Sequence, residues 1–163
     1  MNSILTHETI LMVEDDENDA LLLQRAFAKA GHGDNWRLAR DGAQAIDYLS
    51  GIGSYADRVA FPMPFLMLLD LKMPGVDGFE VLQWVRKQPE LKRLLVVVLT
   101  SSNLQKDVDR AYELGANSYL VKPVEFEGTV SLLSRFEAYW AEINRIPTVQ
   151  RLPEPALAGS SVI

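Results

Sequence analysis

Short apolar runs alternate along the chain with longer segments of helical periodicity, and this alternation restricts the fold more than any other feature. Each apolar run has the length of a buried strand, and several are rich in Val, Ile or Leu. The runs occupy residues 9–13, 36–39, 65–69, 94–99 and 118–121. The helical segments occupy residues 18–30, 42–49, 78–88, 104–114 and about 125–144, and Gly or Pro closely follows each one, as is usual where a helix stops.

Strict alternation of strands and helices predicts an α/β fold. Right-handed crossovers between successive strands give a parallel sheet with helices on both faces. We expect a doubly wound, five-stranded sheet in the order 2-1-3-4-5, one of the two common orders for such sheets. We assign residues 8–144 to the domain, 1–7 to an N-terminal lead and 145–163 to a C-terminal tail or arm. Residues 51–64 are long for a helix-to-strand connection and should form an ordered excursion or a mobile flap.

Charge and composition exclude several classes of protein. With 22 acidic and 16 basic residues the formal net charge is −6, the wrong sign for a general binder of nucleic acid. The chain has no cysteine, and its two histidines lack the spacing of paired ligands, so a bound metal must sit on oxygen. The longest apolar stretch contains two prolines and is too short to span a membrane. The acidic N-terminal region is unlike a signal peptide and favours the cytoplasm.

Polar residues follow four of the five expected strands, at the ends where open α/β sheets bind ligands. In the order 2-1-3-4-5 these four strands are neighbours, about 4.8 Å apart, so the polar groups should form one row. The row consists of Glu14, Asp15 and Asp16 after the first strand, Asp70 after the third, Thr100, Ser101 and Ser102 after the fourth, and Lys122 and Pro123 after the fifth.

This row has the groups needed for cation binding and phosphoryl chemistry. Clustered carboxylates repel one another unless a cation lies among them. Mg²⁺ is the natural choice, because it takes oxygen ligands, keeps several waters and commonly acts together with a phosphate. Asp70 could attack a phosphoryl donor to give an acyl phosphate. The Lys122 ammonium and the Thr100 hydroxyl would then stabilise the added charge.

Each group also has an ordinary structural explanation. Acids between a strand and a helix are often N-caps, and for residues 14–16 taken alone this is the better explanation. Asp70 could be a loop acid, Thr100 a strand-end hydroxyl and Lys122 a solvated lysine. The functional interpretation therefore depends on four strand ends supplying complementary groups to one row.

Four segments carry a resemblance to a known family. They are ILMVEDD at residues 10–16, LLDLKMPGVDG at 68–78, VVVLTS at 96–101 and YLVKP at 119–123. In this order they resemble the four signatures of two-component response regulator receiver domains, over about residues 8–144. The resemblance implies the flavodoxin-like receiver fold and a signalling switch. It implies no enzyme activity beyond self-phosphorylation and slow hydrolysis of the aspartyl phosphate.

The resemblance also implies a role for each residue of the row. Asp70 becomes the phosphoacceptor. The Mg²⁺ ligands are Asp15, Asp70 and the Lys72 backbone carbonyl, with Glu14 completing the acidic pair. The phosphate-binding and switch residues are Thr100, Ser101, Tyr119 and Lys122, and the Lys122–Pro123 bond would be cis. In the implied mechanism Thr100 moves toward the phosphoryl group and Tyr119 rotates into the vacated space, although Tyr119 could also simply pack against the fourth helix.

The resemblance further implies a histidine kinase as the phosphate donor. The connection at residues 51–64, the end of the last helix and the tail are similar to single-domain regulators that serve phytochrome-type histidine kinases and form homodimers through the last helix and its extension. We expect no second domain after residue 144, and output should then pass through a partner protein. The apolar residues of the last helix spread over about half the helical wheel, as either a thick core stripe or a dimer face. They are Phe126, Leu132, Leu133, Phe136, Tyr139, Trp140 and Ile143.

Three other classes share parts of this pattern. A haloacid-dehalogenase-like phosphatase also forms an aspartyl phosphate, but it needs a second acid two residues after the nucleophile, where this chain has Lys72. A flavin-binding flavodoxin would place hydroxyls and glycines after the first strand, where an acidic run would instead repel phosphate. A pseudo-receiver would use the same fold only for protein interaction, and no missing group argues for it.

Overall fold

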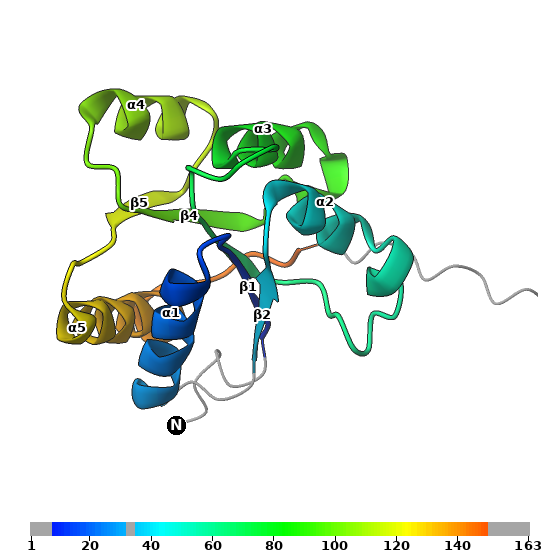
Figure 1. Cartoon of the computed structure of the whole chain (residues 1–163). Coiled ribbons are helices and arrows are strands. Elements are labelled where there is room, and N and C mark those ends of the chain that lie inside the picture. Colours follow the sequence, from blue (N-terminus) through cyan, green and yellow to red (C-terminus); the bar gives the residue numbers. More distant parts are fainter. Residues whose placement is uncertain (1–7, 32–34, 150–163) are drawn as a thin grey trace, which may run out of the picture.

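The apolar runs form the strands of one parallel sheet (Figure 1). The computed structural model describes residues 8–31 and 35–149. The sheet has the order β2-β1-β3-β4-β5, and every neighbouring pair is parallel, which confirms the predicted topology. Its strands are β1 (Ile10–Val13), β2 (Trp36–Ala39), β3 (Leu66–Leu69), β4 (Leu95–Thr100) and β5 (Ser118–Val121).

Five helices connect or follow these strands. They are α1 (Glu17–Lys29), α2 (Gly42–Ser50), α3 (Gly78–Lys87), α4 (Gln105–Glu113) and α5 (Phe126–Glu137), with short 3-10 turns at Gly53–Tyr55 and Pro89–Leu91. The last helix differs from the expected continuous α-helix, because it passes into a π-helical segment over Ala138–Ile143. Hydrophobic periodicity alone does not separate these two helix types, since both keep apolar residues on one side.

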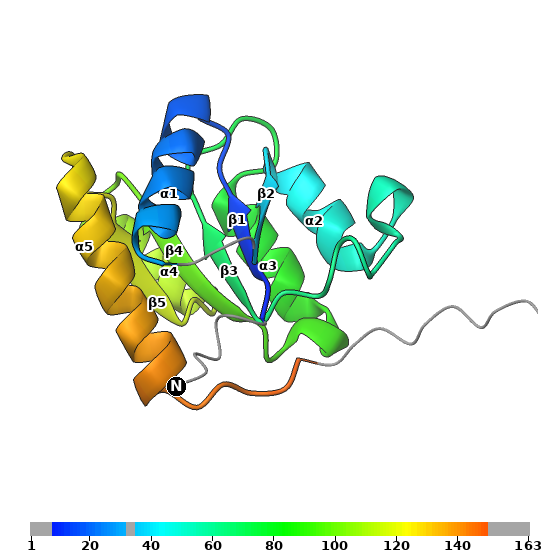
Figure 2. The same cartoon turned by 90° about the horizontal axis from the view of Figure 1, so that it is seen from below.

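The helices form one layer on each face of the sheet. Helices α1 and α5 lie together on one face, and α2, α3 and α4 lie on the other (Figures 1 and 2). The central strands β1, β3 and β4 are buried along their whole length, as expected for strands covered on both sides. Alternate residues of β1 supply the two cores: Leu11 and Val13 contribute to one, and Ile10 and Met12 to the other.

The start of α3 is packed closely against the loop that follows β3. Asp77 and Glu80 form a reciprocal capping box, which fixes the first turn of the helix. Gly78 follows the cap, and a Cβ atom there would lie 2.2 Å from the backbone oxygen of Asp70. Only glycine allows this close approach, so Gly78 helps to fix the backbone at Asp70.

Residues 51–64 form an ordered excursion, the first of the two expected alternatives. The Arg58 guanidinium donates hydrogen bonds to the backbone carbonyls of Tyr48, Leu49 and Phe61. The buried Tyr48 hydroxyl donates to the Pro62 carbonyl at 2.8 Å. These bonds tie the excursion to the C-terminal end of α2.

The chain after the last helix folds back against the domain. Figure 2 shows the segment after the last helix running beneath the sheet, and Ile146 packs against the core that α1 and α5 cover. The predicted tail continues through residues 150–163, which lie outside the described residues. Within residues 8–31 and 35–149, no helix is both long enough and apolar enough to cross a membrane.

Candidate functional site

Three carboxylates converge at the C-terminal edge of the sheet. Glu14 and Asp15 follow β1, Asp70 follows β3, and each supplies an oxygen within 4.8 Å of the others. Glu14 is 1% exposed and Asp70 is 7% exposed, whereas Asp15 is half-buried. The donor set consists only of hard oxygen ligands, which suits a divalent ion such as Mg²⁺ or Mn²⁺. These residues form a candidate divalent metal site.

Glu14 is the most deeply buried acid of the cluster. Burial raises the pKa of its carboxyl to about 7, and contact with Lys122 opposes the shift. The backbone amide of Asp16 also donates to Glu14 Oε1 at 3.1 Å. The Glu14 side chain is therefore fixed in place and needs a positive partner to remain ionised.

Lys122 supplies that positive charge from the end of β5. Its ammonium contacts Glu14, Asp19 Oδ2 at 2.9 Å and Asp70 Oδ2 at 3.4 Å. Burial alone would lower the pKa of Lys122, but hydrogen bonds to Glu14 and Asp19 and the negative charges of Asp70 and Glu14 outweigh it and raise the pKa. The lysine thus stays protonated and links the ends of β1, β3 and β5 with the first turn of α1.

Asp19 is the member of this group that sequence reasoning missed. It lies in the first turn of α1, where its backbone amide donates to the capping carboxylate of Asp16 at 2.8 Å. An acid in a first turn is usually explained by the helix dipole. One signal in the sequence was available. Helix α1 begins directly after the acidic run, so the first turn of α1 lies close to the site.

The hydroxyl-bearing end of β4 lies beside this cluster. Thr100 is fully buried, and its backbone oxygen accepts a hydrogen bond from the Lys122 amide at 2.8 Å. Ser101 is exposed, whereas Ser102 is buried and donates through Oγ to Asp107 at 2.5 Å. The structure therefore places the end of β4 next to the backbone of Lys122.

Tyr119 connects β5 to the loop after β4. Its ring is half-buried against the core on the α2–α3–α4 face, and its hydroxyl donates to the Ser102 carbonyl at 2.9 Å. Burial raises the pKa of the Tyr119 hydroxyl above its usual value. The phenol is accordingly a neutral hydrogen-bond donor. It links the Tyr119 side chain to the backbone of the loop two residues beyond Thr100.

Two expectations concerned the backbone beside the acids. The Lys72 amide lies 3.5 Å from Asp70 Oδ1 and the Lys72 side chain is exposed, whereas the Lys72 carbonyl as a metal ligand stays a prediction. The predicted cis bond between Lys122 and Pro123 is wrong, because the part of the chain that the structure describes contains no cis peptide bond. The trans isomer is the more stable form of an X–Pro bond by about 0.5–1 kcal/mol.

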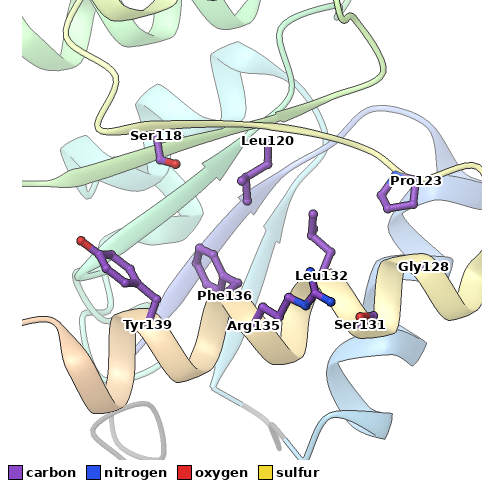
Figure 3. Close-up of a pocket in the computed structure, with 9 residues that line it drawn as sticks. All are labelled: Ser118, Leu120, Pro123, Gly128, Ser131, Leu132, Arg135, Phe136 and Tyr139. Carbon is purple, nitrogen blue, oxygen red and sulfur yellow. The ribbon is translucent and has the colours of Figure 1, made fainter.

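A groove of about 470 Å³ runs between β5 and α5, away from the acidic cluster (Figure 3). The ring of Phe136 and the side chains of Leu132 and Tyr139 face β5 across it. Tyr139 is 49% exposed and Ile143 is 71% exposed, so the apolar stripe of the last helix extends beyond the core. The stripe thus both contributes to the core and reaches the surface, and the dimer face remains a prediction.

The fold and the site together define the class of the protein. A model of the response regulator receiver domain family matches residues 10–134, and the chain belongs to this family. It is a receiver-domain response regulator rather than a catalytic enzyme, as the sequence resemblance predicted.

Individual relatives match most of the chain. The probable methanogenesis regulatory protein FilR2 of Methanothrix harundinacea is 40% identical and covers 85% of this chain and 86% of its own length. The response regulator Rcp1 of Synechocystis is 36% identical over 86% of this chain and 93% of its own length, and its Mn²⁺-bound structure superimposes with a TM-score of 0.77. The phosphorylated cyanobacterial phytochrome response regulator RcpA is 34% identical, with a TM-score of 0.80 over 87% of this chain and 99% of its own.

Proposed function

We propose that this chain is a phosphorylation switch that accepts a phosphoryl group on Asp70 with Mg²⁺ bound beside it. The observation that carries the proposal is the position of Asp70. Its carboxylate lies within 4.8 Å of ligand oxygens of Glu14 and Asp15, and Asp70 Oδ2 lies 3.4 Å from the Lys122 ammonium. A phosphoryl group on Asp70 would therefore lie beside the Lys122 ammonium and beside a metal ion held by these acids.

Transfer to Asp70 is a direct displacement. A carboxylate oxygen bonds to phosphorus while the bond from phosphorus to the donor breaks, and the donor atom leaves with the electron pair. The donor atom is a histidine nitrogen of a kinase or the acyl oxygen of acetyl phosphate. When bound, Mg²⁺ would neutralise charge on the phosphoryl oxygens. Asp15, Asp70, Glu14 and the Lys72 carbonyl would hold the ion, and Lys122 would bind a phosphoryl oxygen.

The contacts around Thr100 support a route from the site to the protein surface. The Thr100 carbonyl accepts from the Lys122 amide, and the Ser102 carbonyl two residues later accepts from Tyr119. Movement of Thr100 and its neighbour Ser101 toward a phosphoryl group would thus change the position of Tyr119. In our proposal this shift in population between two packings alters the face formed by α4, β5 and α5.

The test is phosphorylation by acetyl phosphate, with and without Mg²⁺, followed by intact mass. We expect one phosphoryl adduct that requires Mg²⁺ and is absent from Asp70→Asn. An adduct that persists in Asp70→Asn would place the acceptor elsewhere. Absence of any adduct from the folded wild-type protein would favour the pseudo-receiver, an interaction module with an unused site.

We further propose a histidine kinase partner, with a bacterial phytochrome kinase as the specific candidate. The support is similarity to a protein described as a phytochrome response regulator, RcpA. Incubation with phosphorylated phytochrome kinase and with a non-phytochrome histidine kinase tests the assignment. Faster transfer from the phytochrome kinase is expected, and equal transfer from both would remove the specific assignment.

We also propose that the groove beside α5 contributes to a homodimer through the last helix and its extension. Tyr139 and Ile143 extend the apolar face past the core and leave it partly exposed. Ile143→Asp should therefore lower the dimer fraction in sedimentation or light-scattering experiments. Leu21→Asp on α1 is the matched control, because Leu21 is also an exposed apolar residue but lies on another helix. Equal effects of the two substitutions, or a monomeric wild type, would contradict this interface.

A further inference from the structure

The ammonium of Lys122 has as many partners as it has hydrogens. A lysine ammonium offers three donors, and here they meet Glu14, Asp19 and Asp70. The contact with Asp70 is the longest, at 3.4 Å, and the contact with Asp19 is 2.9 Å. A phosphoryl group on Asp70 would place several anionic oxygens beside this ammonium, where they would compete with Glu14 and Asp19 for its three hydrogens.

The two remaining partners differ in what their release would cost. The Glu14 side chain is 2% exposed, so water could not replace the lysine contact there. The Asp19 side chain is 41% exposed and can be hydrated in place of the lost contact. Asp19 is therefore the partner that Lys122 can exchange.

We propose that Asp19 is a positioning residue that holds Lys122 in the unphosphorylated protein and releases it to the phosphoryl group. The inference rests on the proposed phosphorylation of Asp70 and adds a residue that regulates it. Asp19 is held in the first turn of α1, while Lys122 is attached to the end of β5 beside Thr100. Exchange of this contact would thus loosen a link between α1 and β5 at the moment of phosphorylation.

Removal of the Asp19 charge should favour the contact between Lys122 and the phosphoryl group over the contact between Lys122 and residue 19. Because the Asp19 side of the pair is open to water, we take the strength of a surface ion pair, which corresponds to an equilibrium factor of up to about fivefold. We expect Asp19→Asn to bind beryllium trifluoride, a mimic of an aspartyl phosphoryl group, about two- to fivefold more tightly than wild type at saturating Mg²⁺. Asp19→Ala, which removes the acceptor oxygen entirely, should change the affinity in the same direction.

The matched control is Glu17→Gln. Glu17 lies in the same helical turn and carries the same charge, but it pairs with Arg40 at 3.2 Å instead of Lys122. This variant removes one negative charge from the first turn while leaving the Lys122 contacts intact. We expect its affinity for beryllium trifluoride to match wild type, so that any gain in the Asp19 variants is assigned to the lost contact and not to net charge.

Titration of the folded proteins with beryllium trifluoride, followed by tryptophan fluorescence, decides the question. Tighter binding by both Asp19 variants with an unchanged Glu17→Gln supports the exchange. Wild-type affinity in the Asp19 variants, or an equal gain in Glu17→Gln, would overturn it while leaving the phosphoacceptor proposal in place. If wild type fails to bind and behaves like the Asp70→Asn blank, the receiver chemistry itself fails, and the role of Asp19 fails with it.

Discussion

Replacement of Lys122 by Met should destabilise the metal-free protein far more than loss of a surface ion pair. Methionine retains much of the apolar stem but removes the ammonium that faces Glu14, Asp19 and Asp70. Removal of one partner from a buried pair typically costs 3–5 kcal/mol of unfolding free energy. Uptake of a proton by Glu14, whose pKa is already near 7, would offset part of that cost. We therefore expect a loss of about 3 kcal/mol at neutral pH.

The assay is urea unfolding in the presence of a chelator, with Lys29→Met as the control. Lys29 pairs with Glu127 at 2.8 Å, but the two side chains are 54% and 74% exposed, so its loss should cost about 1 kcal/mol or less. Saturating Mg²⁺ should narrow the difference between Lys122→Met and wild type, because a bound cation replaces the missing positive charge among the acids. Equal losses in the two variants, or a difference that Mg²⁺ leaves unchanged, would refute this account of the site.

Three further predictions follow from individual contacts. Asp15→Asn should lower Mg²⁺ affinity by at least about tenfold in calorimetric titration, and wild-type affinity would place the metal elsewhere. Gly78→Ala should reduce unfolding free energy by about 1–3 kcal/mol and slow phosphorylation, because its Cβ would lie 2.2 Å from the Asp70 backbone oxygen; unchanged urea midpoints would show that the loop adapts. Burial raises the pKa of Tyr48 from 10.0 to about 12, so the folded state holds this proton more tightly than the unfolded state. The resulting stability is complete below pH 10.0 and is lost as pH rises toward about 12, a change of about 3 kcal/mol that should be missing from the alkaline unfolding profile of Tyr48→Phe.

Local signals in the sequence determined the elements and the main members of the site. The ranges predicted for β2 and β5 agree with the structure, β1 and β3 each begin one residue later than predicted, and β4 is shifted by one residue at both ends. The reason is that apolar runs, capping acids and helix-stopping residues act within a few positions of the chain. The row of strand-end groups was also predictable, because parallel strands bring their carboxyl ends to one edge. This is how Asp70 and Lys122 could be placed together from sequence.

Tertiary structure decided the contacts that complete the site. Asp19 and Lys122 are 103 positions apart, and no local pattern distinguishes Asp19 from an acid that merely stabilises the start of α1. Hydrophobic periodicity likewise predicts neither the isomer of the Lys122–Pro123 bond nor the π-helical segment that follows α5. The sequence by itself determined which groups reach the C-terminal edge of the sheet. Their pairing depends on how α1 and β5 meet in three dimensions. Burial and neighbouring groups from other elements determine whether Glu14 and Lys122 are charged.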